Sequence, residues 1–197
     1  MAAEVIAHIA SRRSVAKFTE QAVSPQLISE IIEMGTFAPC HKRTDPWRFV
    51  IFEGAGRDAL ACAMMNGYAA AKQGFDGYEE NLEKIKRKPY RAPTIIMVWC
   101  AAGRAKKNPP VWEDHAAVAA CLQNMSLAAH AFGLGSIWRT GGAVDFPQVQ
   151  DLCKTETDSF DASKGDKIMG MLYVGHMDNN FPKPNRFPEE AQVVCYK

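Results

Sequence analysis

Apolar residues along the chain follow two kinds of spacing, which together predict a protein built from both helices and strands. Recurrence at helical spacing predicts helices at 2–12, 25–38, 56–72, 114–132 and 147–153. Short runs rich in apolar, aromatic and β-branched residues predict strands at 47–52, 94–101, 136–138, 168–175 and 192–196. Because helices and strands intermix along the whole chain, the expected fold class is mixed α/β or α+β.

Two of these elements are expected to lie deep in the fold. The helix at 114–132 is apolar around nearly its whole circumference, which indicates burial at the centre of the domain or in a subunit interface. The run at 94–101 is apolar without alternation and predicts a strand covered on both faces. Ser24 and Pro25 mark a helix start, because serine is a good N-cap and proline suits the first helical position.

The segment 74–91 is charged and mixes both signs. This pattern predicts a short exposed helix or a mobile flap with a solvated face rather than a binding patch. We find no internal repeat and no domain boundary, so residues 1–197 are expected to form a single domain. The tail at 181–197 is too long and apolar to be mere disorder, and it is expected to pack on its own sheet or on that of a partner.

Composition narrows the classes of function. The chain has 197 residues, of which 47% are hydrophobic and 23% charged, and its formal net charge is +1. This charge argues against a nucleic-acid or membrane-surface partner, and no apolar run is long enough to span a bilayer. The first residues lack the basic start and apolar run of a signal peptide, so a cytoplasmic protein is expected.

The spacing of cysteine and histidine gives no sign of a metal site. The six cysteines are scattered without a C-x-x-C pair, and the five histidines do not gather with carboxylates at ligand spacing. Cys40 stands apart in a polar loop beside His41 and Arg43, where positive charge would favour a thiolate. No positioned base accompanies it, so a loop cysteine without a catalytic role is the favoured interpretation.

Two distant segments carry chemistry that could bind a ligand. Arg12, Arg13 and Ser14 place two guanidinium groups beside a hydroxyl, a set suited to a phosphate group. Residues 138–142 (Trp-Arg-Thr-Gly-Gly) follow a predicted strand, and their glycines allow a ligand to approach the backbone closely. Each segment also has an ordinary explanation, as a basic last turn that offsets a helix dipole or as a plain strand-to-loop turn.

Five blocks, in order along the chain, resemble motifs of the nitroreductase family of FMN-dependent oxidoreductases. They are Arg12-Arg13-Ser14 with Phe18, Ala38-Pro39 through Pro46-Trp47-Arg48-Phe49-Val50, and the segments 128–135, 170–175 and 183–190. The Ala-Pro-x-His-Lys loop combined with Ile-Trp-Arg-Thr-Gly is similar to a compact subgroup of small NAD(P)H nitroreductases.

The resemblance implies an α+β fold with a mixed central sheet flanked by helices. It also implies a homodimer with FMN in both interfaces. The C-terminal segment 181–197 would then be exchanged and extend over the partner subunit, and the helix at 114–132 would become interface core. An obligate interface of this kind is large and apolar.

The resemblance also assigns residues to the cofactor site. Arg12, Arg13 and Ser14 would hold the phosphate and ribityl chain of FMN, and Arg186 in the tail would approach the phosphate. The other cofactor contacts implied are Lys17, Pro39, His41, Trp138, Arg139 and Thr140. The loop at 40–45 replaces the family's usual serine, asparagine and glutamine, and Trp138-Arg139-Thr140 stands where other members carry Glu-Gly. Substrate preference therefore does not carry over.

The activity implied is a ping-pong reduction without a metal or an essential catalytic side chain. NAD(P)H delivers a hydride to flavin N5 and leaves, and a nitroaromatic, quinone or similar small-molecule acceptor is then reduced in the same place. Lys17 and Arg139 would favour the reduced flavin, which is anionic near N1. Two alternatives stay open, namely a flavin-binding or storage protein with little turnover and a specialised dehydrogenase or dehalogenase of the same superfamily.

Overall fold

Antiparallel strands form the central sheet of the computed structural model, which describes residues 2–105 and 109–177. The strands are β1 (Trp47–Glu53), β2 (Thr94–Cys100), β3 (Gly135–Arg139) and β4 (Lys167–Gly175), and their order in the sheet is β1-β2-β4-β3. Each neighbouring pair is antiparallel. Within the described residues, the parallel component of the expected mixed sheet is an isolated bridge between Ser14 and Ser136.

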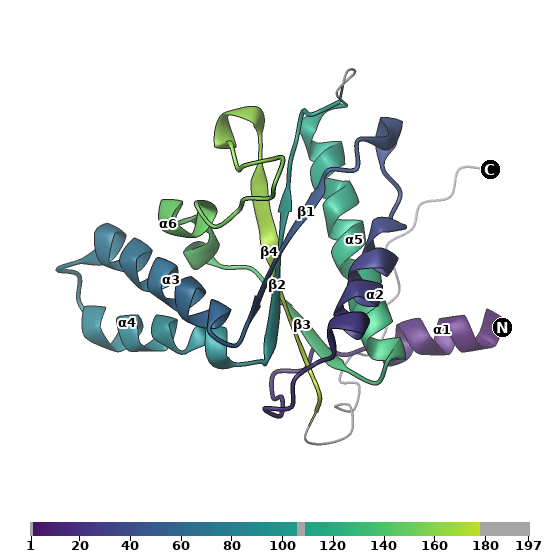
Figure 1. The fold of residues 1–197 in the computed structure, drawn as a ribbon, viewed down its shortest axis with the longest axis horizontal. Helices are drawn as coiled ribbons and strands as arrows, with labels where there is room; N and C mark the ends of the chain where they lie inside the picture. Colours follow the sequence, from purple (N-terminus) through teal and green to yellow (C-terminus); the bar gives the residue numbers. More distant parts are fainter. Residues whose placement is uncertain (1, 106–108, 178–197) are drawn as a thin grey trace, which may run out of the picture.

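Helices cover both faces of the sheet, which confirms the α+β class (Figure 1). One face carries α1 (Ala2–Ser11), α2 (Pro25–Thr36) and α5 (Val111–Ala131), and the other carries α3 (Gly56–Lys72), α4 (Tyr78–Lys86) and α6 (Pro147–Gln150). The shorter turns are η1 (His41–Arg43), η2 (Lys88–Tyr90), η3 (Gly142–Asp145) and η4 (Ala162–Lys164). The charged segment 74–91 therefore contains a short helix, α4, which was the first of the two structures expected for it.

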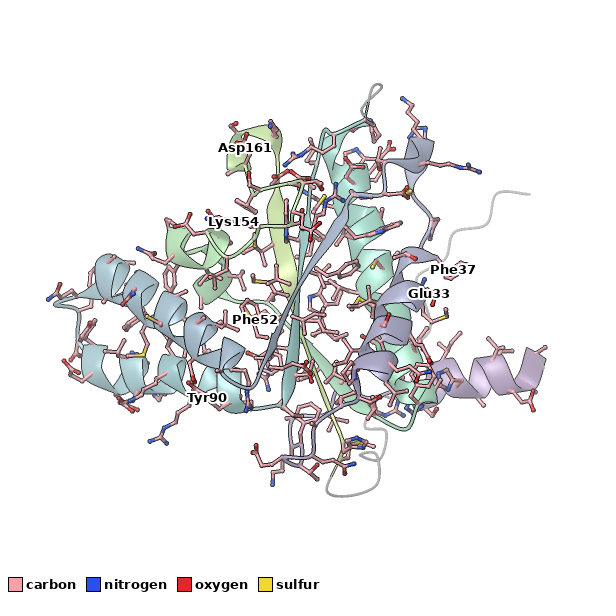
Figure 2. All side chains as sticks on the ribbon, in the orientation of Figure 1. Glu33, Phe37, Phe52, Tyr90, Lys154 and Asp161 are labelled. Carbon is pink, nitrogen blue, oxygen red and sulfur yellow. The ribbon has the colours of Figure 1, made fainter. Side chains whose placement is uncertain are left out.

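The alternating side chains of β2 divide the core into two clusters. Ile96 and Val98 pack with α2 and α5, whereas Ile95 and Met97 pack on the α3 side, because successive strand residues point to opposite faces. Phe52 belongs to the second cluster and lies between the sheet and α3 (Figure 2). Every residue of β2 is buried, as its unalternating apolar pattern predicted.

Helix α5 lies at the centre of the domain, which is one of the two placements expected for it. Cys121 and Met125 are fully buried and pack against α2 at Gly35. A Cβ on Gly35 would lie 2.7 Å from Met125 Cγ, so only glycine allows the two helices to approach this closely. At the start of α2, the Ser24 hydroxyl accepts a hydrogen bond from the Leu27 amide at 3.3 Å, which confirms the predicted cap.

The described residues end before the C-terminal tail. The expected strand at 192–196, the exchanged segment 181–197 and Arg186 lie outside them.

Candidate functional site

The two segments singled out in the sequence meet at the first residues of β3. Ser14 forms the parallel bridge with Ser136, and the Val15 amide donates to the Ser136 carbonyl at 2.9 Å. Val15 is buried against Gly135, where a Cβ would lie 3.0 Å from Val15 Cγ1. These contacts fix Arg12–Ser14 beside the sheet edge that leads to Trp138.

Arg13 folds back onto the end of α1. Its Nη1 donates to the carbonyls of Ala10 and Arg12, both at 2.7 Å, and its buried Nε has no hydrogen-bond partner. Such contacts satisfy the carbonyls that a helix leaves open at its C-terminus. The helix-end interpretation therefore describes Arg13, whereas Ser14 and Lys17 have exposed side chains.

A pair of histidines holds α1 against α5 beside this motif. The rings of His8 and His130 stack with their centroids 4.6 Å apart, and the Ser11 hydroxyl is 2.8 Å from His130 Nε2. Burial lowers the pKa of His130, and the positive charges of His8, Arg12 and Arg13 lower it further. The start of β3 is thus a region of positive potential that suits an anion.

At the other end of β3, Trp138 lies across Gly170 of β4. A Cβ on Gly170 would lie 2.4 Å from Trp138 Nε1, and the φ of Gly170, +139°, is one that side-chain-bearing residues rarely adopt. The indole Nε1 donates to the Met169 carbonyl at 2.9 Å, which fixes the ring. The indole is 38% exposed and offers an aromatic surface at the sheet edge.

The outer edge of β3 presents backbone groups to solvent. The Ser136 carbonyl points outward to Val15, and the two-residue repeat of a strand places the backbone groups of Trp138 and Thr140 on the same side. In the part of the chain that the structure describes, no strand pairs with this side after Ser136. A Cβ on Gly141 would meet nothing within 4 Å, so a planar ring has room there.

The Arg139 side chain lies on the face of the sheet that α3 covers, opposite to the face of Trp138. Its guanidinium carbon lies 5.8 Å from the centre of the Tyr173 ring, and its buried Nε has no hydrogen-bond partner. Strand alternation sends consecutive side chains to opposite faces, which explains this separation. Trp138 and Arg139, grouped together in the sequence, therefore serve two different surfaces.

The loop with Pro39 and His41 lies at the far end of the sheet from Ser14. Ser136 is linked through β4 to Thr94, whereas the loop leads into Trp47, which pairs with Cys100. Those positions in β2 are six residues apart, or about 20 Å along a strand. Within one chain, the structure therefore does not bring Pro39 and His41 to the other predicted site residues.

The same loop is anchored to the start of α5. His41 Nδ1 lies 2.5 Å from Glu113 Oε2, and the Thr44 hydroxyl donates to Asp114 Oδ1 at 2.7 Å. The Cys40 thiol donates a hydrogen bond to Asp45 Oδ1 at 3.3 Å, and no base lies against it among these contacts. This arrangement agrees with a loop cysteine that has no catalytic role.

The sequence interpretation missed three residues around the end of β3. Gly170 supports Trp138, while Lys88 and Arg91 border the same cavity as Arg139. Both cations come from the segment interpreted as a solvated face, and only the prolines around them, Pro89 and Pro93, hinted at a fixed turn. Residues 2–105 and 109–177 contain no cluster that could hold a metal ion and no helix able to cross a membrane.

Two curated relatives match most of the chain. The "Putative NAD(P)H nitroreductase YdjA" of Escherichia coli (strain K12) is 33% identical over 186 residues, which cover 94% of this chain and 95% of YdjA. The "Putative NAD(P)H nitroreductase YfhC" of Bacillus subtilis (strain 168) is 31% identical over 172 residues, with coverage of 86% and 82%.

Solved structures show the same fold. A nitroreductase-like family protein from Bacillus cereus superposes with a TM-score of 0.77 at 27% identity, over 96% of this chain and 95% of that one. A "putative nitroreductase in complex with fmn" from Desulfovibrio desulfuricans gives a TM-score of 0.63 at 26% identity, over 98% of both chains. The sequence profile of the Nitroreductase family matches residues 9–176, which include both segments at β3, and the chain belongs to the nitroreductase family.

Proposed function

We propose that the protein is an FMN-dependent oxidoreductase that takes a hydride from NAD(P)H and passes electrons to a nitroaromatic, quinone or similar acceptor. The observation that carries this proposal is the junction of Arg12–Ser14 with β3. At the start of β3 this junction places the guanidinium and hydroxyl groups of Arg12–Ser14. At the end of β3, backbone groups that pair with no described strand lie beside the indole of Trp138. The FMN complex of the Desulfovibrio desulfuricans relative and the NAD(P)H in the name of YdjA support it.

The described residues fit FMN. Arg12 and Ser14 would hold the phosphate, in the positive potential that lowers the pKa of His130. The outer edge at 138–140 would bond the polar edge of the ring, and the open space at Gly141 leaves room for it. Arg186, outside the described residues, is proposed to join the phosphate.

The side chains of this site position the reactants rather than transfer electrons. FMN, when bound, supplies the electron transfer that no side chain here can perform. Donor and acceptor would occupy the same place in turn, which gives a ping-pong sequence. Of the two cations proposed to favour the reduced ring, Arg139 lies against Tyr173 on the face of the sheet opposite to Trp138, and Lys17 has an exposed side chain.

We further propose that the enzyme is a homodimer and that the partner's loop completes the site. Apolar side chains on one face of α1 are exposed, with Ile6 at 68%, and Phe37 on the outer side of α2 is exposed at 71% (Figure 2). A groove of about 440 Å³ beside Phe37 and Phe132 continues this surface. A second copy would cover it, bring in its own Pro39 and His41, and be overlaid by the tail at 181–197.

The visible spectrum of the purified protein tests the proposal. We expect the spectrum of oxidised flavin, and bleaching on anaerobic addition of NADH or NADPH. A protein that binds no added FMN would contradict the proposal, whereas a flavin that neither nicotinamide reduces would indicate a storage protein.

Sedimentation tests the dimer. Ile6→Asp places a charge on the exposed face of α1 and should yield monomers that lose FMN. Phe75→Asp, at another exposed aromatic residue, is the control and should remain dimeric. An Ile6→Asp protein that is still dimeric would show that this face is not the interface.

A further inference from the structure

A cavity of about 110 Å³ opens beyond the last residue of β3 and is bordered by three cations. Lys88 comes from η2, Arg91 follows that turn, and Arg139 comes from β3. Met64 and Tyr173 line the apolar part of the wall. Positive groups from separate parts of the chain thus converge on one small space, and two of them, Lys88 and Arg91, lie outside the motifs assigned to the cofactor site.

None of these three charges is neutralised within the part of the chain that the structure describes. No carboxylate there forms an ion pair with Lys88, Arg91 or Arg139. Burial lowers the pKa of Lys88, and the two guanidinium groups lower it further. Holding like charges together costs free energy, and such an arrangement is typical of a site that receives an anion.

The turn that carries two of the cations is held in place. The Tyr90 hydroxyl donates to Asp58 Oδ1 at 2.6 Å, and the guanidinium carbon of Arg57 lies 5.7 Å from the centre of the Tyr90 ring. Arg57 Nη1 also donates to the Ala92 carbonyl at 3.1 Å. These contacts fix η2 to α3, so the backbone that carries Lys88 and Arg91 is in place before a ligand binds, which lowers the cost of binding.

The size of the cavity limits what can enter. Its volume of about 110 Å³ is enough for a phosphate or carboxylate group. Thr140 and Gly141, at the proposed flavin edge, also border the cavity. A group bound here therefore belongs to a molecule that can extend to the flavin.

We propose that this cavity binds the phosphate or carboxylate group of the small molecule that exchanges electrons at the flavin. The proposal rests on the proposed function. The phosphate of FMN is assigned to the other end of β3, because Ser136 and Arg139 are three residues apart, or about 10 Å along the strand. The two sources of the anion are the 2′-phosphate of NADPH and the carboxylate of an aromatic acceptor.

Calorimetric titration of the FMN-loaded protein tests the site. Inorganic phosphate, NADP⁺ against NAD⁺, which cannot reduce the flavin, and 4-nitrobenzoate against nitrobenzene are titrated at constant ionic strength into wild type, Lys88→Met and Lys167→Met. Lys167→Met removes an equal charge from an exposed position on β4 and serves as the control. We expect Lys88→Met to weaken the anionic ligand at least tenfold and to leave its uncharged or unphosphorylated counterpart unchanged.

The outcomes separate the sources. A loss confined to NADP⁺ identifies the 2′-phosphate, and a loss confined to 4-nitrobenzoate identifies an acceptor carboxylate. Equal affinities in Lys88→Met and Lys167→Met for all ligands would overturn the proposal. A Lys88→Met protein that purifies without FMN would assign the cavity to the flavin phosphate and would also overturn the cavity proposal. The proposed function itself would be contradicted only by a wild type that binds no FMN.

Discussion

The two ends of β3 both gather positive charge, but they use it differently. At the start of the strand, Arg13 is bonded to backbone carbonyls and His130 is held by a stacked histidine and a serine. At its end, Lys88 and Arg139 border a cavity without an ion-pair partner among the described residues. At the start of β3 the positive groups are therefore held by protein contacts, whereas at its end the cations have no ion-pair partner among the described residues.

This difference suggests a division of roles, in which the start of β3 provides affinity for the cofactor and the end of β3 provides selectivity for the exchanging ligand. Groups that protein contacts already hold suit a cofactor that stays bound, because few side chains lose conformational freedom when it binds. Cations without ion-pair partners suit a ligand that binds, is selected by its charge and then dissociates. Substitutions that disturb one end without the other can test this division.

The largest effect is expected from Gly170→Ala at the end of β3. The new Cβ would lie 2.4 Å from Trp138 Nε1 and 2.8 Å from the Arg139 carbonyl, at a φ of +139°. Strain and overpacking together should cost about 3 kcal/mol of unfolding free energy. Urea unfolding measures this loss, and a change within 0.5 kcal/mol, estimated as ordinary for surface sites, would show that Trp138 can move aside at no cost.

A smaller effect is expected from Gly135→Ala at the start of β3. Its Cβ would meet Val15 Cγ1 at 3.0 Å and Met177 Cγ at 2.8 Å, both side-chain atoms that can shift. The cost should be about 1 kcal/mol, and the displaced Arg12–Ser14 segment should release FMN faster. Stopped-flow release measures this rate.

Gly56→Ala is the matched control for both glycines. A Cβ on Gly56 meets nothing within 4 Å, so stability and FMN release should match those of wild type. If Gly135→Ala released FMN at the same rate as Gly56→Ala, the junction with β3 would not position the phosphate site.

Much of the architecture followed from local patterns in the sequence. The helix Gly56–Lys72 begins and ends as predicted, the Ser24 cap forms, and β2 is buried throughout, because each depends on spacing and on residues a few positions apart. The resemblance assigned Arg12–Ser14 and residues 138–140 to one cofactor site, but it did not predict that the first segment meets β3 within one chain.

The details that the sequence did not predict depend on tertiary placement. Whether Arg139 points with Trp138 or away from it depends on the strand's alternation at an edge, and Lys88 reaches the cavity only because η2 is fixed to α3. The distance between His41 and Ser14 depends on strand order, which local spacing does not encode. The cofactor roles of all the residues that the resemblance assigned, from Arg12 to Arg186, stay predictions.

The smallest effect concerns the pH dependence at the start of β3. Burial and neighbouring positive charge lower the pKa of His130 from its ordinary 6.5, so the folded protein binds fewer protons there than the unfolded chain. Its contribution to stability is present above pH 6.5 and is lost as the pH falls through the folded pKa. His130→Asn should flatten the fall in unfolding free energy below pH 6.5, and an unchanged pH dependence would contradict the shift.

The relative affinities for FMN and riboflavin test most directly the claim that the cofactor phosphate sits at the start of β3. Wild type should bind FMN more tightly than riboflavin, and Arg12→Ala should reduce this preference at least tenfold, as expected for a hydrogen bond to a charged group worth roughly 1.5–3 kcal/mol. Lys88→Met, which removes a cation from the other end, should keep the preference. A preference that survives in Arg12→Ala, or that disappears in Lys88→Met, would contradict the account.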